Sequence, residues 1–292
     1  MLLPPYPPRG YPDEGWPLPE GVRLIENVPV TEHDGVPLHA DVLEPPAPNG
    51  ATIVWVHGGG WRWCDRRTAF ERLFRFTERG WTGVTLDYRL TDVARFPAPV
   101  RDVQAGLRWV AEEVGRRGLD PDRVVGFGGS AGAHLLLLSV LGAQDAEIGD
   151  PAGETLAALI AAFPPTDILT LDDFTDGIVP QFEHHSADSC EGRLLGDAPA
   201  AVRELARQAS PLAHVRPTKP IRLLHGTDDA VVPLDQSERL AAALQDVGSP
   251  VELRTYPGGH GARGWPDGWL RDAIRWAERM VGRRPVTGST DL

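Results

Sequence analysis

The sequence predicts an α/β fold built on a mostly parallel, doubly wound sheet, and two patterns indicate it. From residue 51 onward, short apolar strands alternate with longer segments of helical periodicity. Several of these strands are apolar at successive positions, which is typical of strands buried on both faces of a parallel sheet. With 292 residues and a hydrophobic fraction of 41%, the chain can bury a substantial core.

The predicted elements follow one another in a regular order. Two short strands, at residues 22–30 and 38–43, flank a turn at His33-Asp34-Gly35 and predict a hairpin at a sheet edge. Six further strands are expected at residues 52–56, 82–87, 124–127, 159–163, 221–224 and 251–256. Helices are expected at residues 67–79, 98–117, 131–141, 234–247 and 269–281.

Two segments depart from this alternation. Residues 1–20 contain seven prolines and predict an extended N-terminal arm, followed by one domain over residues 21–292. The aromatic residues Tyr6, Tyr11 and Trp16 either belong to a loosely packed leader or dock onto the body or a second subunit. Residues 164–212 are too long for a simple connection, so we expect a lid-like excursion over one sheet edge, within the domain.

Composition excludes several classes of protein. The formal charge of −12 and the scattered arginines argue against nucleic-acid binding, which needs a basic surface. The two cysteines, Cys64 and Cys190, exclude a disulfide framework and are expected to be reduced thiols. There is no signal-peptide pattern, and no apolar run approaches the about 20 residues of a membrane span. We therefore expect a cytoplasmic protein with no membrane partner, and leave open whether it forms a homo-oligomer.

The segment Gly128-Gly129-Ser130-Ala131-Gly132 is a G-x-S-x-G element between a predicted strand and a predicted helix. Such a turn forces the serine into a strained conformation, requires small neighbours and projects the hydroxyl above the sheet. The helix start behind it offers backbone N–H groups that can stabilise a negative oxygen. The pattern predicts that Ser130 is a nucleophile.

A serine nucleophile needs a base and an acid that orients the base. Among the nine histidines, His260 lies in a glycine-rich loop after the last predicted strand, at the same sheet edge as Ser130. The acid is expected after the preceding strand, where Asp228 and Asp229 compete. Strand alternation lets only one of these two carboxylates point inward.

The segment His57-Gly58-Gly59-Gly60-Trp61 follows another predicted strand and suits the second half of an oxyanion hole, because glycines let backbone N–H groups approach closely. No phosphate-loop signature accompanies it. We expect structural roles for His57 and His225, and interpret the adjacent pair His184-His185 as lid surface rather than as metal ligands. No metal and no cofactor is predicted.

Seven segments together resemble the α/β-hydrolase superfamily. They are HGGGW at 57–61, LDYRL at 86–90, FPAPVRD at 96–102, GGSAGAHL at 128–135, SPLAHV at 210–215, HGTDDAVVP at 225–233 and the glycine-flanked His260. Within that superfamily, they are similar to the esterase/lipase branch with an HGGG or HGGxW oxyanion loop, near the hormone-sensitive-lipase-like and kynurenine formamidase-like enzymes. The resemblance covers about residues 36–281 and implies an α/β-hydrolase fold.

The resemblance also implies roles for individual residues. It makes Ser130 the nucleophile and His260 the base, and it places the acid at Asp229 rather than Asp228. Gly58, Gly59 and Ala131 match the positions that supply oxyanion N–H groups. The sequence departs from many relatives at Ala133, where a second glycine is common, and we expect this methyl group to affect helix packing only.

The favoured hypothesis is a carboxylesterase that cleaves small-molecule acyl esters through an acyl-enzyme intermediate. The first alternative is an amide hydrolase, such as an arylformamidase or an exopeptidase-like enzyme. The second is a non-catalytic ligand receptor on the same fold, which would be expected to lack a member of the triad. Trp61 and Trp63 lie next to the glycine loop and either line a substrate pocket or pack in the core.

Overall fold

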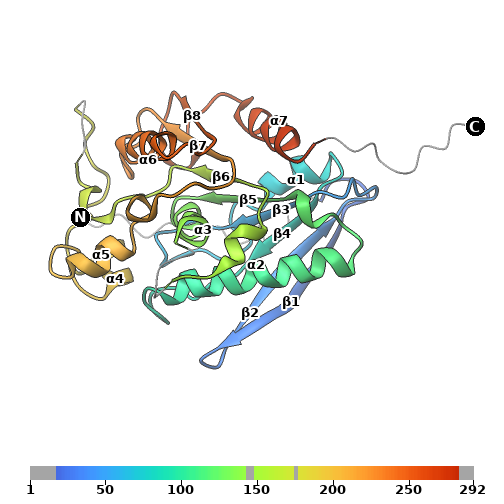
Figure 1. Cartoon of the computed structure of the whole chain (residues 1–292), viewed down its shortest axis with the longest axis horizontal. Coiled ribbons are helices and arrows are strands. Elements are labelled where there is room, and N and C mark those ends of the chain that lie inside the picture. Colours follow the sequence, from blue (N-terminus) through green and yellow to red (C-terminus); the bar gives the residue numbers. More distant parts are fainter. Residues whose placement is uncertain (1–17, 143–147, 174–176, 283–292) are drawn as a thin grey trace, which may run out of the picture.

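The computed structural model describes residues 18–142, 148–173 and 177–282, so most of the predicted N-terminal arm lies outside the described residues. Within these ranges the strands form one eight-stranded sheet in the order β1-β2-β4-β3-β5-β6-β7-β8 (Figure 1). The strands are β1 (Arg23–His33), β2 (Val36–Glu44), β3 (Thr52–Val56), β4 (Thr82–Leu86), β5 (Val124–Gly129), β6 (Ala158–Ala162), β7 (Ile221–Gly226) and β8 (Val251–Tyr256).

The strand directions confirm the predicted fold class. β1 pairs with β2 and β2 with β4 in antiparallel fashion, and every pairing from β4 through β8 is parallel. The predicted hairpin is therefore the antiparallel edge of the sheet. Because the parallel strands all run the same way, the loops that follow them meet at the carboxyl ends of the strands, which is where α/β proteins place their ligands.

Helices cover both faces of the sheet. α1 (Glu71–Thr77) and α7 (Trp269–Val281) pack on one face, and α2 (Ala98–Arg116), α3 (Ala131–Leu141) and α6 (Asp235–Asp246) pack on the other. Alternation along β3 serves both layers, since Val54 belongs to the core under α2 and α3 while Trp55 belongs to the core under α1 and α7.

The first predicted helix is shorter than the sequence pattern indicated. It was expected from residue 67, but α1 begins at Glu71. Asp65 and Thr68 form a turn in which the Thr68 amide bonds the Asp65 carbonyl at 2.9 Å. Ala69 then adopts a φ of 60°, which a right-handed helix cannot include. The backbone turn at residues 65–68 and the positive φ of Ala69 thus delay the helix.

The excursion over residues 164–212 carries two short helices, α4 (Cys190–Leu195) and α5 (Arg203–Gln208). Its base is closed by a bond from the Leu212 amide to the Thr166 carbonyl at 2.9 Å. The Thr166 hydroxyl in turn donates to the Gln236 carbonyl on α6 at 2.7 Å. The excursion is thus anchored to the body at its base.

Short 3₁₀ helices lie at Pro121–Arg123, Pro151–Thr155, Ile168–Thr170, Pro211–His214 and His260–Ala262.

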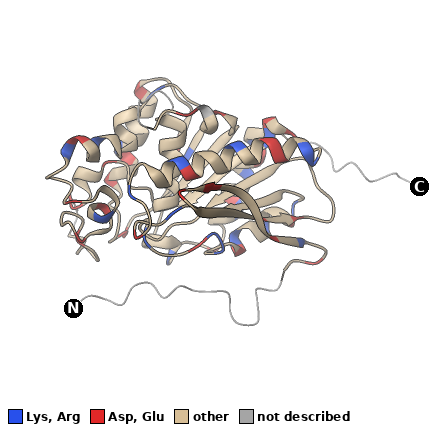
Figure 2. Ribbon diagram, turned by 90° about the horizontal axis from the view of Figure 1, so that it is seen from below, with Lys and Arg blue, Asp and Glu red and all other residues tan. Residues whose placement is uncertain are grey.

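Acidic and basic residues are interspersed along the ribbon in Figure 2 and do not separate into segments of one sign. Many of them form ion pairs along one helix, such as Arg116 with Glu112 and Glu113 on α2. Across the described ranges, no helix has the length and apolar character needed to cross a membrane.

Candidate active site

The turn that carries Ser130 joins β5 directly to α3. Ser130 has φ 52° and ψ −121°, the strained conformation predicted for it. A Cβ atom on Gly128 would lie 2.6 Å from the Ala133 amide nitrogen, and one on Gly132 would lie 2.1 Å from the Val56 carbonyl oxygen. Both flanking glycines are therefore required by backbone contacts, and the elbow packs directly on the end of β3.

The glycine loop after β3 lies beside this elbow. A Cβ atom on Gly58 would lie 3.3 Å from the Cβ of Ser130 and 2.7 Å from the Gly129 carbonyl oxygen. Gly59 has a φ of 104°, which only glycine adopts easily. Within the described part of the chain, the amides of Gly58, Gly59 and Ala131 donate no backbone hydrogen bond. These three N–H groups, from two adjoining segments, remain available to an acceptor.

Buried histidines hold the glycine loop from behind. The Nδ1 of His57 donates to the Gly58 carbonyl at 2.8 Å, and its ring stacks on Tyr88 at 4.3 Å between centroids. Burial lowers the pKa of His57, so this histidine is neutral near pH 7. The Tyr88 hydroxyl donates to the His57 carbonyl at 3.1 Å. The structural role expected for His57 agrees with these contacts.

Trp61 packs in the core rather than lining an open pocket. Its side chain is 1% exposed, and its indole N–H donates to Nδ1 of His134 at 3.1 Å. His134 uses its other nitrogen to donate to the Ala209 carbonyl at 2.7 Å, and burial lowers its pKa to about 4. This neutral imidazole links the glycine loop, α3 and the end of the excursion. Trp63 stays partly exposed.

The structure brings His260 and Asp229 together. Nδ1 of His260 donates to Oδ2 of Asp229 at 2.8 Å, which leaves Nε2 as the nitrogen that can accept a proton. The other carboxylate oxygen accepts the amides of Val231 and Val232, each at 2.9 Å. Asp229 is therefore held by three hydrogen bonds in a buried position.

The charge state of Asp229 follows from these partners. Burial by itself would raise its pKa, but the charge and hydrogen bond of His260, together with the imidazole of His225 at 3.5 Å, outweigh burial and hold the pKa well below the usual range. His225 is completely buried between Ser237 and the Val232 carbonyl and so supports the acid loop from below. Asp229 is an anion at neutral pH.

Asp228 has a different position. It is exposed, and its Oδ2 accepts the Gly258 amide at 3.0 Å, two residues before His260. This bond ties the acid loop to the histidine loop through the backbone. Of the two competing aspartates, Asp229 contacts the imidazole and Asp228 anchors the loop that carries it.

Phe163 is a residue of the site that sequence reasoning did not identify. Its ring lies 4.6 Å from the His260 ring between centroids, and a Cβ atom on Gly129 would lie 3.3 Å from it. Phe163 thus contacts both the serine elbow and the histidine. Its φ of 42° is unusual for a bulky residue. The sequence placed it at a strand end but offered no signal that the backbone turns there.

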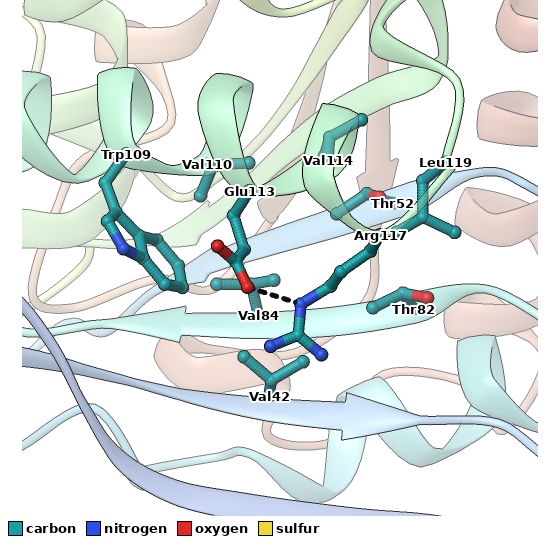
Figure 3. A pocket seen from close by; sticks show the side chains of 10 residues that line it. All are labelled: Val42, Thr52, Thr82, Val84, Trp109, Val110, Glu113, Val114, Arg117 and Leu119. Carbon is teal, nitrogen blue, oxygen red and sulfur yellow. Dashed lines mark hydrogen bonds and ion pairs between the residues drawn. The ribbon is translucent and has the colours of Figure 1, made fainter.

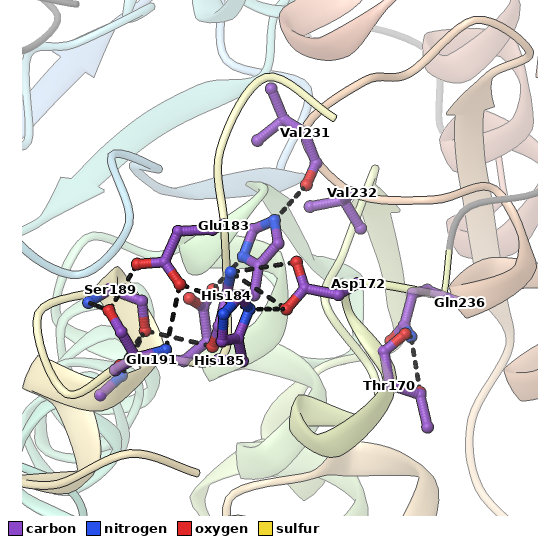
Figure 4. A network of polar contacts seen from close by, with 12 residues as sticks. Thr170, Asp172, Glu183, His184, His185, Ser189, Glu191, Val231, Val232 and Gln236 are labelled. Atoms are coloured by element: carbon purple, nitrogen blue, oxygen red, sulfur yellow. Dashed lines mark hydrogen bonds and ion pairs between the residues drawn. The ribbon is translucent and has the colours of Figure 1, made fainter. Parts of the chain in front are cut away.

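The excursion packs on the acid loop through a buried histidine, contrary to the expectation that the pair His184-His185 is lid surface. His184 is 6% exposed, its Nε2 donates to the Val231 carbonyl at 2.8 Å, and its Nδ1 lies 3.0 Å from Glu191 (Figure 4). Adjacent side chains point in different directions, so only His185 is exposed, where it pairs with Asp172 at 3.0 Å.

A small pocket lies at the opposite end of the parallel strands (Figure 3). Thr52 and Thr82, the first residues of β3 and β4, line it together with α2, and its charged residues Glu113 and Arg117 pair with each other at 2.7 Å. This pocket does not belong to the site. In the described ranges, no group of three or more His, Cys, Asp or Glu side chains could hold a metal ion.

A family model named BD-FAE matches residues 41–244, which is more than half of the chain and includes the glycine loop, the elbow and the acid loop. The chain belongs to the BD-FAE family. The α/β-hydrolase resemblance is confirmed by this match and by the sheet topology. The match ends before His260, so the position of the histidine in this BD-FAE member is known from the geometry described above.

Several curated relatives of this BD-FAE member are named as esterases. It is 32% identical to Esterase LipQ of Mycobacterium tuberculosis over 74% of this chain and 51% of that protein. It is 27% identical to isoprenylcysteine alpha-carbonyl methylesterase ICME of Arabidopsis thaliana, over 82% of this chain and 54% of the relative. The chain thus spans about half the length of the curated relatives it matches.

Solved structures share the fold. A truncated carbohydrate esterase from gut microbiota superposes with a TM-score of 0.75 at 21% identity, covering 89% of this chain and 96% of that one. The native esterase 2 of Thermogutta terrifontis superposes with a TM-score of 0.68 at 24% identity, covering 94% of this chain and 97% of that one. At these identities the likeness establishes the α/β-hydrolase fold of the BD-FAE member.

Proposed function

We propose that this protein is a serine hydrolase of carboxylic esters, with Ser130 as nucleophile, His260 as general base and Asp229 as the acid that orients the base. The observation that carries the proposal is the hydrogen bond from Nδ1 of His260 to the buried Asp229 carboxylate. That bond selects the tautomer in which Nε2 can accept the serine proton. The esterase names of the curated relatives support the choice of bond.

The mechanism uses the residues of the sheet edge in sequence. His260 takes the Ser130 proton as the hydroxyl oxygen attacks the ester carbonyl, and Asp229 stabilises the resulting imidazolium. The oxyanion then accepts hydrogen bonds from the backbone N–H groups of Gly58, Gly59 and Ala131. These groups donate to no other backbone acceptor among the described residues. Collapse expels the alcohol, which receives the proton from His260. A water molecule, deprotonated by the same imidazole, releases the acid from Ser130.

Ser130→Ala is the variant that tests the proposal. It should reduce kcat for 4-nitrophenyl butyrate by about 10⁶-fold, because the covalent step has no substitute nucleophile. A fluorophosphonate probe should label the wild type and leave the variant unlabelled. Ester turnover that persists in Ser130→Ala would overturn the mechanism.

The same assay separates the alternatives. N-formylkynurenine and an aminoacyl anilide are compared with the ester on the wild type. An amide preference of more than about tenfold in kcat/KM, or about 1.4 kcal/mol of transition-state binding, would identify an amide hydrolase instead. Failure of the probe to label Ser130 would favour a receptor.

A further inference from the structure

Arg62 places a positive charge beside the glycine loop. Its amide donates to the Gly59 carbonyl at 3.1 Å, so Gly59 and Arg62 are the ends of one tight turn. Its guanidinium carbon lies 5.0 Å from the centre of the Trp63 ring. Nε of Arg62 is buried without a hydrogen-bond partner. A guanidinium is always charged in a protein, so this site holds a fixed cation.

Three acidic residues of the neighbouring chain segments, one after the glycine loop and two on the excursion, have other partners. Asp65 accepts the Arg67 amide at 2.9 Å and is otherwise exposed. On the excursion, Glu191 pairs with the buried His184 at 3.0 Å, and Glu183 accepts the amide of Ser186 at 3.1 Å. Among the described residues, the nearby Arg66 and Arg67 both pair with Asp41, whereas Arg62 forms no ion pair with a carboxylate, although the protein as a whole carries a formal charge of −12.

Arg62 follows the glycine loop that lies beside Ser130. The Cβ position of Gly58 is 3.3 Å from the Cβ of Ser130, and the turn returns the chain to Arg62 three residues after Gly59. On the other side, Sγ of Cys190 on α4 would lie 2.7 Å from a Cβ on Gly60. Arg62 therefore lies on the turn that follows the oxyanion loop and that contacts α4 of the excursion at Gly60.

We propose that Arg62 recognises a carboxylate carried by the substrate, so that esters with an anionic acyl or alcohol part are the preferred class; this inference rests on the proposed function. A planar guanidinium binds a carboxylate through two parallel hydrogen bonds. The Trp63 ring keeps the guanidinium plane in place and so limits the conformational entropy lost on binding. Recognition by Arg62 is thus separate from the chemistry at Ser130.

Matched pairs of esters test the proposal. The acyl arm compares 4-nitrophenyl butyrate with mono-4-nitrophenyl succinate, and the alcohol arm compares phenyl butyrate with 3-carboxyphenyl butyrate. For Arg62→Gln, the ratio of kcat/KM for the carboxylate ester to that for its neutral partner should fall about tenfold to a hundredfold in one arm, mainly through KM. The arm that responds identifies the part of the substrate that carries the charge.

Two further variants sharpen the test. Arg62→Lys should retain part of the carboxylate preference, because it keeps the charge and loses the paired hydrogen bonds. Arg275→Gln, which removes an exposed charge from α7, should leave the ratio unchanged and controls for net charge. A ratio that is the same in the wild type and in Arg62→Gln in both arms overturns the proposal.

A binding measurement separates this inference from the proposed function. Monoethyl succinate and ethyl butyrate are titrated into Ser130→Ala and into Ser130→Ala with Arg62→Gln, with binding followed by calorimetry. Preferential binding of the succinate ester that is lost with Arg62 supports the inference even if no turnover is observed. Equal binding of monoethyl succinate in the two proteins, together with an alcohol arm that does not respond to Arg62→Gln, overturns it, whereas ester turnover through Ser130 would still support the proposed function.

Discussion

The two oxygens of Asp229 have different partners, and this difference decides how the residue can act. Oδ1 accepts hydrogen bonds from the backbone amides of Val231 and Val232, while Oδ2 accepts a hydrogen bond from Nδ1 of His260. An asparagine at this position would turn its carbonyl oxygen toward the two amides, because these donors require an acceptor. Its NH₂ group would then face His260 and force Nδ1 to accept.

The Asp229→Asn variant is therefore expected to hold the wrong tautomer of His260. With the proton on Nε2, the imidazole cannot deprotonate Ser130, and kcat for a 4-nitrophenyl ester should fall by about 10⁴-fold at pH 7. Asp228→Asn is the matched control, since its amide oxygen can still accept the Gly258 amide, and its activity should stay within about threefold of the wild type. Equal losses in the two variants would contradict the assignment of roles.

Single residues were predictable from the sequence only where backbone chemistry restricts them. The glycines of the elbow and of the loop after β3 could be recognised, because close backbone contacts leave no room for a Cβ atom at Gly58 or Gly132. Phe163 could not, because a phenylalanine at a strand end carries no sign of its φ of 42°. The choice of Asp229 over Asp228 needed the resemblance, since both follow the same strand.

At the scale of elements, Gly132 lets the start of α3 pack closely against the end of β3. A Cβ atom there would lie 2.1 Å from the Val56 carbonyl oxygen and 2.4 Å from that of His57. The same contact positions the Ala131 amide opposite the Gly58 loop. The spacing of two elements thus sets the spacing of the candidate oxyanion donors.

Gly132→Ala is expected to separate these elements. Overpacking against backbone should destabilise the protein by about 3 kcal/mol, and displacement of one donor should lower kcat about 10²-fold. Gly115→Ala is the control in α2, where a Cβ atom meets nothing within 4 Å, and it should stabilise by about 0.5–1 kcal/mol. Urea unfolding and ester kinetics measure both effects, and unchanged kinetics in Gly132→Ala would count against this account of the loop.

The order of elements could be predicted because hydrophobic periodicity reports burial locally, and every predicted strand occurs in the sheet within a few residues. The start of α1 could not, since it depends on the Asp65–Thr68 turn and the positive φ of Ala69. The burial of His184 also depends on a long-range contact, with the Val231 carbonyl, that leaves no local pattern.

At the scale of the whole molecule, the excursion and the acid loop are joined by a buried ion pair. His184 and Glu191 lie 3.0 Å apart with side-chain exposures of 6% and 4%. Burial would lower the pKa of His184, but the charge and hydrogen bond of Glu191 outweigh burial and raise it. His184 thus holds its proton more tightly in the folded protein than in the unfolded chain.

This raised pKa predicts a pH-dependent contribution to stability. The ion pair contributes fully below about pH 6.5, the ordinary histidine value, and the contribution is lost as pH rises through the raised folded value. Glu191→Gln should therefore reduce the free energy of unfolding by about 1–3 kcal/mol at acidic pH near 5.5, and by less near pH 9. Glu112→Gln, which removes an exposed pair with Arg116, should have little effect at either pH. A difference in the free energy of unfolding between wild type and Glu191→Gln that grows with pH would refute this pH-dependent contribution of the ion pair.

The position of β8 has a consequence for how the protein loses activity. Among the described strands, β8 pairs with β7 alone, and its residues are partly buried or exposed, whereas β5 lies in the middle of the sheet. An edge strand opens locally at lower free-energy cost than a central one. Fraying of β8 would withdraw His260 while Ser130 stays in an intact core. The proposed ester hydrolysis should consequently be lost at lower urea concentrations than those that change the fluorescence of the buried tryptophans, so activity would disappear while most of the protein is still folded.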